Sequence, residues 1–318
     1  MRSAAVLVTA LAVLAGCARP PGASVAAPPT GAPEIHPAWT SCDQVADPGW
    51  PDFAAPLGFP RLPADFAPTA VVVCATGPQP RADGGEDMVR LEKHGSDVEA
   101  LSRALRLPDL PRTAEACTAD LPGVVWFAVL DAAGRWLRPG IAGDACGKLR
   151  IEVRDAVEHL ALTTVHTTVL GETKSSAAAS SGCEQRWADM VGAVTAMPGD
   201  APADRPADAP PGPMRLCLYR VPPSEQGSGK PGGDFERGGP LPDQRWTALR
   251  AELLTAGATP GPCTTHASRF ALFRGPDGRG GEVYAELDGC HRLLFDTPSG
   301  STLRQGTAEL AAHIDQAL

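Results

Sequence analysis

The sequence predicts an α+β fold made of two tandem disulfide-stapled modules, each a small, mostly antiparallel sheet covered by helices. The first observation is a repeated cysteine pattern, with spacings of 32, 43 and 29 positions in one set and 34, 46 and 27 in the next (Cys42, Cys74, Cys117, Cys146; Cys183, Cys217, Cys263, Cys290). The second is a repeated stretch between the last two cysteines of each set, where an apolar run leads into a Gly-containing turn and ends in Asp-small-Cys. The third is the presence of apolar positions at helical spacing on both sides of that stretch. Helices that accompany short strands in this way bury their apolar faces against a sheet.

Residues 1–17 are predicted to be a targeting segment. Arg2 supplies a positive charge, and residues 4–13 form an apolar run that is too short to span a bilayer stably. The motif LAGC, which ends at Cys17, is typical of a lipobox, in which the cysteine becomes lipid-modified. The alternative is an ordinary secretory signal, but it leaves a ninth cysteine without a partner. We therefore expect acylated Cys17 to anchor the protein in the lipid bilayer at the outer face of the cell membrane.

Residues 18–35 are rich in Pro, Ala and Gly and carry almost no charge, which predicts an extended tether. The whole chain has a formal net charge of −9. This balance excludes the basic surface expected of a nucleic-acid-binding protein, and it would repel anionic lipid headgroups. Attachment to the membrane is therefore expected to depend on lipid and not on a basic patch.

The first module is expected over residues 36–170. The run Val71–Cys74 has the continuous apolar character of a buried strand, and a Pro/Gly-rich loop is expected after it at residues 77–95. A helix follows, opened by a capping box at Ser96–Glu99 and stopped by Pro108. Paired strands come next, and a closing helix is indicated by apolar residues at helical spacing (Val153, Ala156, Val157 and Leu160).

A linker of small and polar residues is expected at residues 171–182, and the second module at residues 183–318. Its first strand is expected at residues 214–219, followed by a Pro/Gly-rich loop at 222–242 and a helix from Asp243 to Gly257. The apolar face of that helix has three large members (Trp246, Leu249 and Leu253). A closing helix and an additional helix just after the first cysteine are indicated by the same periodicity (Leu310, Ile314, Ala317; Trp187, Met190, Val191, Val194).

The eight cysteines after Cys17 are expected to pair with their nearest neighbours in sequence (Cys42–Cys74, Cys117–Cys146, Cys183–Cys217 and Cys263–Cys290). No C-x-x-C motif occurs, and evenly matched cysteines in an exported chain are typical of a disulfide scaffold. A two-Cys, two-His zinc site is the alternative (Cys263, His266, Cys290 and His291). Adjacent ligands at 290 and 291 fit tetrahedral geometry poorly, so we expect no metal and no cofactor.

An alternating stretch in the second module is the candidate ligand-binding face. Four polar residues fall on one face of a predicted strand, and apolar residues fall on the other (Glu282, Tyr284, Glu286, Asp288; Val283, Ala285, Leu287). An acidic face of this kind could bind a cation or a basic partner, whereas the alternative is an ordinary solvated sheet face. No serine-nucleophile signature, H-E-x-x-H motif or phosphate-binding loop is present, so no catalytic residue is assigned.

Several segments resemble uncharacterised secreted proteins and lipoproteins of actinobacteria with paired-cysteine modules. The segments that carry the resemblance are SDVEALSRALRLPDLP, WFAVLDAAGRWLRP and DACGK in the first module, and RLCLYR, Cys263 and LDGC in the second. The resemblance implies export and paired cysteines. It implies no activity and assigns no functional residue.

The expected function is therefore that of a non-catalytic binding or interaction module on a membrane-anchored lipoprotein, with a protein, a glycan or a small molecule as its ligand. Two alternatives remain open. One is an exported hydrolase with a site in the second module around Glu282, Glu286 and Asp288. The other is a solute-binding lipoprotein associated with a transporter, although such receptors usually have alternating strand–helix units instead of stapled modules.

Overall fold

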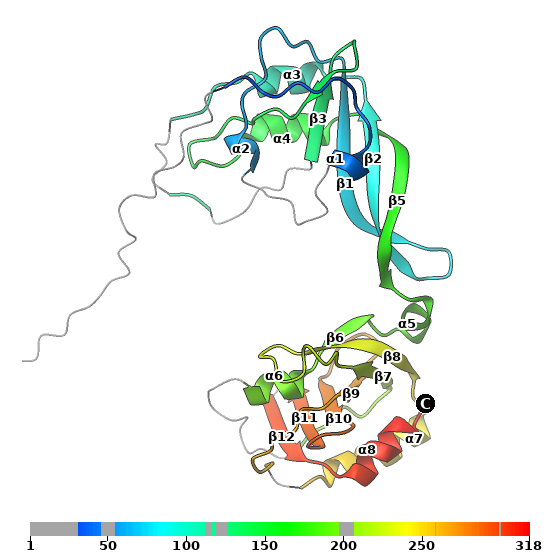
Figure 1. The fold of residues 1–318 in the computed structure, drawn as a ribbon. Coiled ribbons are helices and arrows are strands. Elements are labelled where there is room, and N and C mark those ends of the chain that lie inside the picture. Colours follow the sequence, from blue (N-terminus) through cyan, green and yellow to red (C-terminus); the bar gives the residue numbers. More distant parts are fainter. Residues whose placement is uncertain are drawn as a thin grey trace, which may run out of the picture. The chain divides into compact units, whose positions relative to one another are not determined.

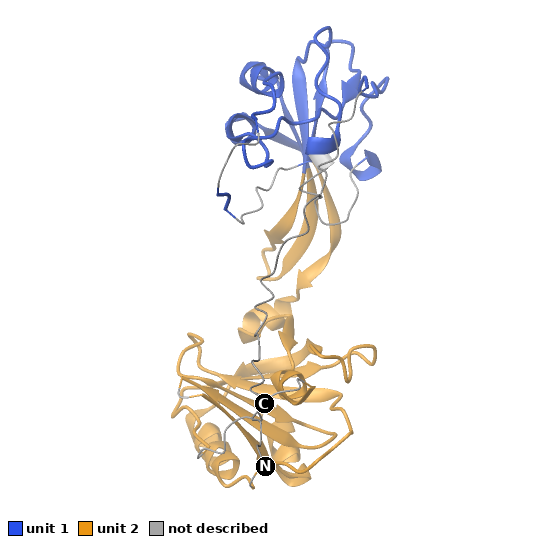
Figure 2. Cartoon of the chain, turned by 90° about the vertical axis from the view of Figure 1, so that its left-hand side faces the viewer, with its two compact units in different colours: residues 1–74, 92–165 blue, residues 75–91, 166–318 orange. Residues whose placement is uncertain are grey.

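The computed structural model describes residues 31–45, 55–111, 116–118, 126–196, 207–257, 259–298 and 300–318. The targeting segment, residues 18–30 of the expected tether and Cys17 lie outside the described residues. The fold is α+β, and the strand pairings with a defined register are antiparallel. Figure 2 shows that the chain divides into two compact units, here called unit 1 (Met1–Cys74 with Glu92–Val165) and unit 2 (Ala75–Leu91 with His166–Leu318).

A five-stranded sheet in the order β4-β3-β1-β2-β5 carries the core of unit 1, although residues 75–80 of β1, 86–91 of β2 and 166–174 of β5 are counted with unit 2 (Figure 1). Its strands are β1 (Ala70–Pro80), β2 (Glu86–Gly95), β3 (Trp126–Leu130), β4 (Trp136–Leu137) and β5 (Thr163–Lys174). Alternate residues of β1 and β3 face the same core, because Val71 lies opposite Val129 and Val73 lies opposite Phe127. The helices α3 (Glu99–Leu105) and α4 (Ile151–Glu158) bury their apolar residues against this face.

The opposite face of the first sheet is covered by the segment that contains α1 (Cys42–Val45). A further short helix, α2 (Ala55–Gly58), belongs to the other side, where Leu57 packs against the core formed with α3 and α4. On the α1 side, Cys42 packs against Val72 and Cys74, with Trp39 and Trp126 at the margin. Trp39 also donates from Nε1 to the carboxylate of Glu92 at 2.9 Å. The N-terminal segment is therefore held to the sheet by a disulfide, a hydrogen bond and apolar contact.

Unit 2 contains a seven-stranded sheet in the order β12-β11-β10-β9-β7-β8-β6. The strands are β6 (Arg186–Ala188), β7 (Arg215–Arg220), β8 (Gly232–Pro240), β9 (Arg269–Arg274), β10 (Glu282–Glu286), β11 (Arg292–Thr297) and β12 (Gly300–Gln305). Helices α7 (Asp243–Leu254) and α8 (Ala308–Asp315) cover one face, and α6 (Met190–Ala196) covers the other (Figure 1). Both faces of this sheet are therefore buried.

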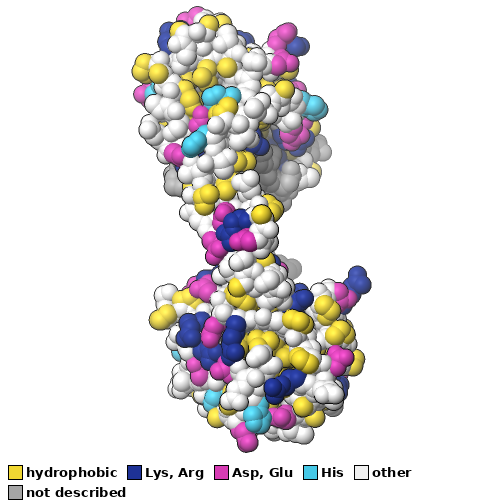
Figure 3. All heavy atoms as spheres, turned by 90° about the vertical axis from the view of Figure 1, so that its right-hand side faces the viewer, with side chains coloured by type: hydrophobic (Ala, Val, Ile, Leu, Met, Phe, Trp, Pro, Cys, Tyr) yellow, Lys and Arg dark blue, Asp and Glu magenta, His cyan; other side chains and the backbone are white. Residues whose placement is uncertain are grey.

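Each face of the second sheet has its own core. The side that faces α7 and α8 includes alternate residues of the central strands (Leu216, Leu218, Ala271, Phe273, Val283, Ala285, Leu293 and Phe295). The side that faces α6 includes the intervening residues (Cys217, Tyr219, Phe270, Leu272, Tyr284 and Leu294). On the surface of unit 2, basic side chains lie beside acidic ones (Figure 3), as in the contacts that Arg269 makes with Glu236 and Asp315.

The four disulfides join the cysteine pairs expected from the sequence: Cys42–Cys74, Cys117–Cys146, Cys183–Cys217 and Cys263–Cys290. In each set of four cysteines one disulfide is buried in a core and the other reaches the surface. The buried ones are Cys42–Cys74 and Cys183–Cys217, whereas Cys117 and Cys263 are exposed. Closing a loop of ~30 residues stabilises the folded state by ~3.6 kcal/mol in the chain-entropy model.

Several expected elements were wrong in detail. The loops expected at 77–95 and 222–242 contain strands β2 and β8, because their Gly and Pro residues sit at strand ends and turns and hide the strands in the sequence. The expected linker at 171–182 contains the end of β5 and a short helix, α5 (Ser176–Ser181).

The expected helix starts also need correction. The capping box at Ser96 does not form, because α3 begins at Glu99 with Val98 at the N-cap and no side-chain capping bond. Trp187 belongs to β6, and α6 begins only at Met190. Within the described residues, no helix is both long and apolar enough to cross a bilayer.

Candidate functional site

The four polar residues expected to form a ligand-binding face lie in or directly after β10, but the face is not solvated. Only 2% of Tyr284 and 1% of Glu286 is exposed. The face is buried because α6 packs against β10 and β11. The alternative of a solvated sheet face was therefore wrong, and the four residues divide among three separate environments.

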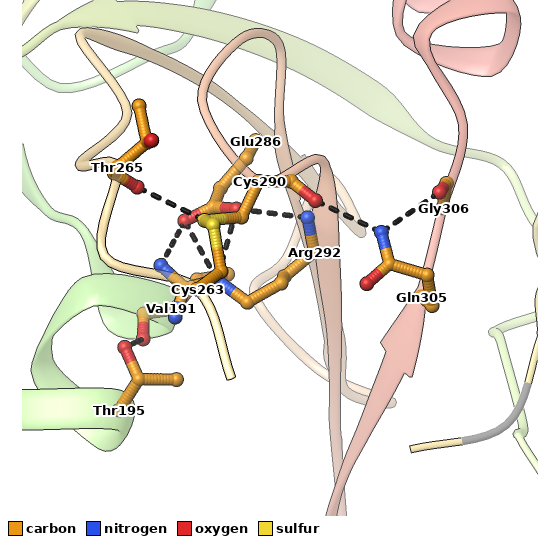
Figure 4. The surroundings of a disulfide bond; sticks show 9 residues. All are labelled: Val191, Thr195, Cys263, Thr265, Glu286, Cys290, Arg292, Gln305 and Gly306. Atoms are coloured by element: carbon orange, nitrogen blue, oxygen red, sulfur yellow. Dashed lines mark hydrogen bonds and ion pairs between the residues drawn. A yellow bond between two sulfur atoms is a disulfide. The ribbon is translucent and has the colours of Figure 1, made fainter. Parts of the chain in front are cut away.

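Glu286 forms a buried ion pair with Arg292, the first residue of β11 (Figure 4). Its two carboxylate oxygens accept from Arg292 Nε at 3.0 and 3.1 Å and from Nη2 at 2.5 Å. The backbone N–H of Arg292 also donates to Oε2 at 2.8 Å. Such a fork-like arrangement is the strong form of the Arg–carboxylate contact. The oxygens of Glu286 are thus occupied by protein donors.

Asp189 is a second buried carboxylate near this pair, and it was not predicted from the sequence. Only 3% of the residue is exposed. It caps α6, because its Oδ1 accepts from the N–H of Gly192 at 3.0 Å. Burial raises the pKa of Asp189 to about 6; the hydrogen bond from Gly192 opposes the rise and the charge of Glu286 adds to it. An N-cap residue directly before the apolar run of α6 was the available signal, but the reading of Trp187 as helical concealed it.

These groups line a cavity of about 90 Å³ in unit 2, here called the Asp189 cavity. Asp189, Glu286 and Arg292 form its charged part, and Ser228 and His266 also line it. The hydroxyl oxygen of Ser228 is buried and has no hydrogen-bond partner within the described structure. A polar space of this size can hold roughly three water molecules or one small polar group. The Cys263–Cys290 disulfide lies directly beside it (Figure 4).

Tyr284 and Glu282 do not line the Asp189 cavity. The hydroxyl of Tyr284 donates to Glu282 at 2.5 Å and accepts from Trp187 Nε1 at 3.0 Å. Burial raises the pKa of Tyr284, so the phenol keeps its proton. The guanidinium of Arg274 lies 4.6 Å from the centre of the Trp187 ring. This network connects β6 to β10 and is structural.

Asp288 closes the turn after β10. Its carboxylate accepts from the backbone N–H of Ser268 at 2.8 Å and from the Ser268 hydroxyl at 2.5 Å. Of the four expected residues, only Glu286 therefore reaches the cavity. Cys263 and Cys290 are bonded to each other, so the zinc-site alternative with His266 and His291 is incompatible with the structure. Among the described residues, no group of three or more His, Cys, Asp or Glu side chains is placed to hold a metal ion.

Compared with known proteins, the chain matches no family model, no curated protein and no solved structure. Its function must therefore be inferred from its own residues.

Proposed function

We propose that this protein is a lipid-anchored extracytoplasmic binding protein. The distribution of its nine cysteines carries the proposal: eight pair in four disulfides, and the ninth is Cys17 at the end of LAGC. Disulfides persist in oxidising compartments outside the cytoplasm, which supports export. A cysteine left over from that pairing, within a lipobox, supports acylation. Two or three acyl chains would then hold the protein at the membrane.

Mass spectrometry of the N-terminal peptide from the membrane-extracted full chain tests the anchor. We expect this peptide to begin at Cys17 and to carry acyl mass. The Cys17→Ser variant should lack that mass while keeping all four disulfides. A wild-type N-terminus at another residue, or an unmodified Cys17, would overturn the anchor.

For the binding function, we propose that the Asp189 cavity accepts a small cationic group that donates hydrogen bonds, such as an ammonium or guanidinium. Glu286 and Arg292 offset each other's charge, so an ionised Asp189 leaves one net negative charge in the lining. The buried hydroxyl of Ser228 offers a further polar contact. The ligand would be a small molecule or a basic side chain of a partner.

The Asp189→Asn variant provides a matched test, because asparagine is an equally good N-cap but carries no charge. Binding of methylammonium and guanidinium to the full chain can be followed by NMR shifts or calorimetry. We expect saturable binding that is lost in Asp189→Asn, and no binding of tetramethylammonium, which is too bulky and donates no hydrogen bond. Equal binding to the wild type and the variant would contradict the proposal.

The hydrolase alternative loses support from the geometry around Glu286. A general base needs an oxygen free to accept a proton from the reacting group. Both oxygens of Glu286 accept hydrogen bonds from Arg292 instead.

A further inference from the structure

The two sheets have four outer strands, and three of them are short or partly covered. β4 has two residues and exchanges backbone hydrogen bonds with His36, at 2.8 Å and 3.0 Å. β6 has three residues. β12 has six residues, and the N–H of Gly257 donates to the carbonyl of Gln305 at its end at 2.9 Å. β5 is the exception, because it is an outer strand of 12 residues (Figure 1).

The first nine residues of β5 contain none of the usual features that keep an outer strand from pairing. Proteins protect such edges with lysine, proline, bulges or inward-facing charges. The run from 163 to 171, TTVHTTVLG, has no Lys, Arg, Asp, Glu or Pro. Six of its residues are Thr or Val, at positions 163, 164, 165, 167, 168 and 169, and β-branched side chains favour strands. Charged residues return only at Glu172 and Lys174.

Side chains on both faces of β5 are exposed. The exposed fraction is 53% for Val165, 61% for Val169 and 42% for Leu170. These are three of the seven large hydrophobic residues that are exposed in the described part of the chain, and they lie within six positions of one another. This concentration on one outer strand marks it as a contact surface.

We propose that β5 pairs in antiparallel fashion with β5 of a second copy of the chain, about a two-fold axis at Thr167. We place the axis at Thr167 because this residue is the centre of the uncharged part of β5, residues 163 to 171. In this register Val165 of each copy lies opposite Val169 of the other, and Thr167 lies opposite Thr167. Such β-branched cross-strand pairs stabilise sheets. A second copy fits this edge because the paired run brings no like charges together, and the self-complementary contact closes as a dimer.

The first test is the mass of the full chain in mild detergent, measured by light scattering after size exclusion. We expect a dimer. Val169→Lys should weaken self-association by at least about tenfold, because it places a charge in the paired run. Ile151→Lys is the matched control: Ile151 is a 56% exposed aliphatic residue on α4, and its replacement should leave the dimer intact. A monomeric wild type, or a dimer that Val169→Lys leaves unchanged, would overturn the proposal.

The second test examines the register by oxidative crosslinking. Directly opposite residues in an antiparallel pair have Cα atoms about 4.5–5.5 Å apart, which is within disulfide range. Thr167→Cys should therefore crosslink two copies, as seen by non-reducing electrophoresis. Thr163→Cys is the control, because the two copies of residue 163 would lie about 27 Å apart. Equal crosslinking of both variants would refute the register. A monomer whose β5 pairs with a strand of another peptide would refute the homodimer.

Discussion

Arg292 holds both carboxylate oxygens of Glu286 within 3.1 Å, although only 1% of Glu286 is exposed. The two residues stand at adjoining ends of β10 and β11, so the ion pair also fixes the turn that carries Cys290. Because both side chains are buried, removing one of them leaves the charge of the other unpaired, and this strongly destabilises the folded state.

Glu286→Ala should therefore destabilise the protein by about 3–5 kcal/mol, because it leaves the guanidinium of Arg292 buried without the carboxylate that accepts its hydrogen bonds. The free energy of unfolding of the full chain in urea provides the measurement. Glu99→Ala serves as the control, because Glu99 pairs with Arg103 at an exposed site and its loss should cost less than about 1 kcal/mol. Equal losses of unfolding free energy in the two variants would show that the buried ion pair contributes no more to stability than the exposed one.

Because Asp189 is buried, we expect its contribution to the free energy of unfolding to fall as the pH rises. Its pKa is raised to about 6 in the folded protein, so the folded state binds a proton more tightly than the unfolded state. The stabilisation of the folded state by this proton is complete below the usual pKa of an aspartate, and it is lost as the pH rises through about 6. Asp189→Asn should thus be more stable than the wild type at pH 7.5 by up to about 3 kcal/mol, with little difference at pH 4. Urea unfolding at both pH values gives the comparison, and a constant difference would contradict the assignment.

The two kinds of disulfide should differ in their resistance to reduction. A buried disulfide is shielded from an attacking thiolate, whereas an exposed one is accessible. Under native conditions we expect a thiol reductant to open Cys117–Cys146 and Cys263–Cys290 before Cys42–Cys74 and Cys183–Cys217. Timed alkylation followed by peptide mapping reads out the order. Simultaneous opening of all four bonds would indicate reduction through global unfolding.

Gly140 allows a sharp test of packing in unit 1. A Cβ atom at this position would overlap the carbonyl oxygen of Phe59, so Gly140→Ala requires the backbone to move. We expect a loss of at least about 1–3 kcal/mol in unfolding free energy. Gly77→Ala is the control, because nothing lies within 4 Å of its Cβ position. A neutral Gly140→Ala variant would show that this contact is not maintained.

Local signals in the sequence predicted much of the fold. The amphipathic helix that starts at Asp243 is present with its buried residues Trp246, Leu249 and Leu253. The closing helices and the four cysteine pairs are also present. These features depend on periodicity and spacing, which can be recognised within one stretch of the sequence.

The candidate site was less predictable because it is assembled from distant segments. The alternation at Glu282, Tyr284 and Glu286 correctly predicted a strand, but it did not predict that the polar face is buried. The helix that covers this face, α6, lies about 90 positions earlier in the sequence. Glu286 finds its counter-charge across a turn, which no periodicity reveals. Strands β2 and β8 were missed because glycine and proline at their ends carry a loop signal that hydrogen bonding to neighbouring strands overrides.

The position of the buried disulfides has a mechanical consequence. In each set of four cysteines, the first cysteine is bonded to the first long strand that follows it, Cys42 to β1 and Cys183 to β7. A pulling force on the chain before Cys42 would pass through sulfur directly into the centre of the sheet. The 31 residues between Cys42 and Cys74 would then bear none of that tension. If the protein is tethered at its N-terminus, the Cys42–Cys74 disulfide would therefore resist stretching at the point where the force reaches the folded part.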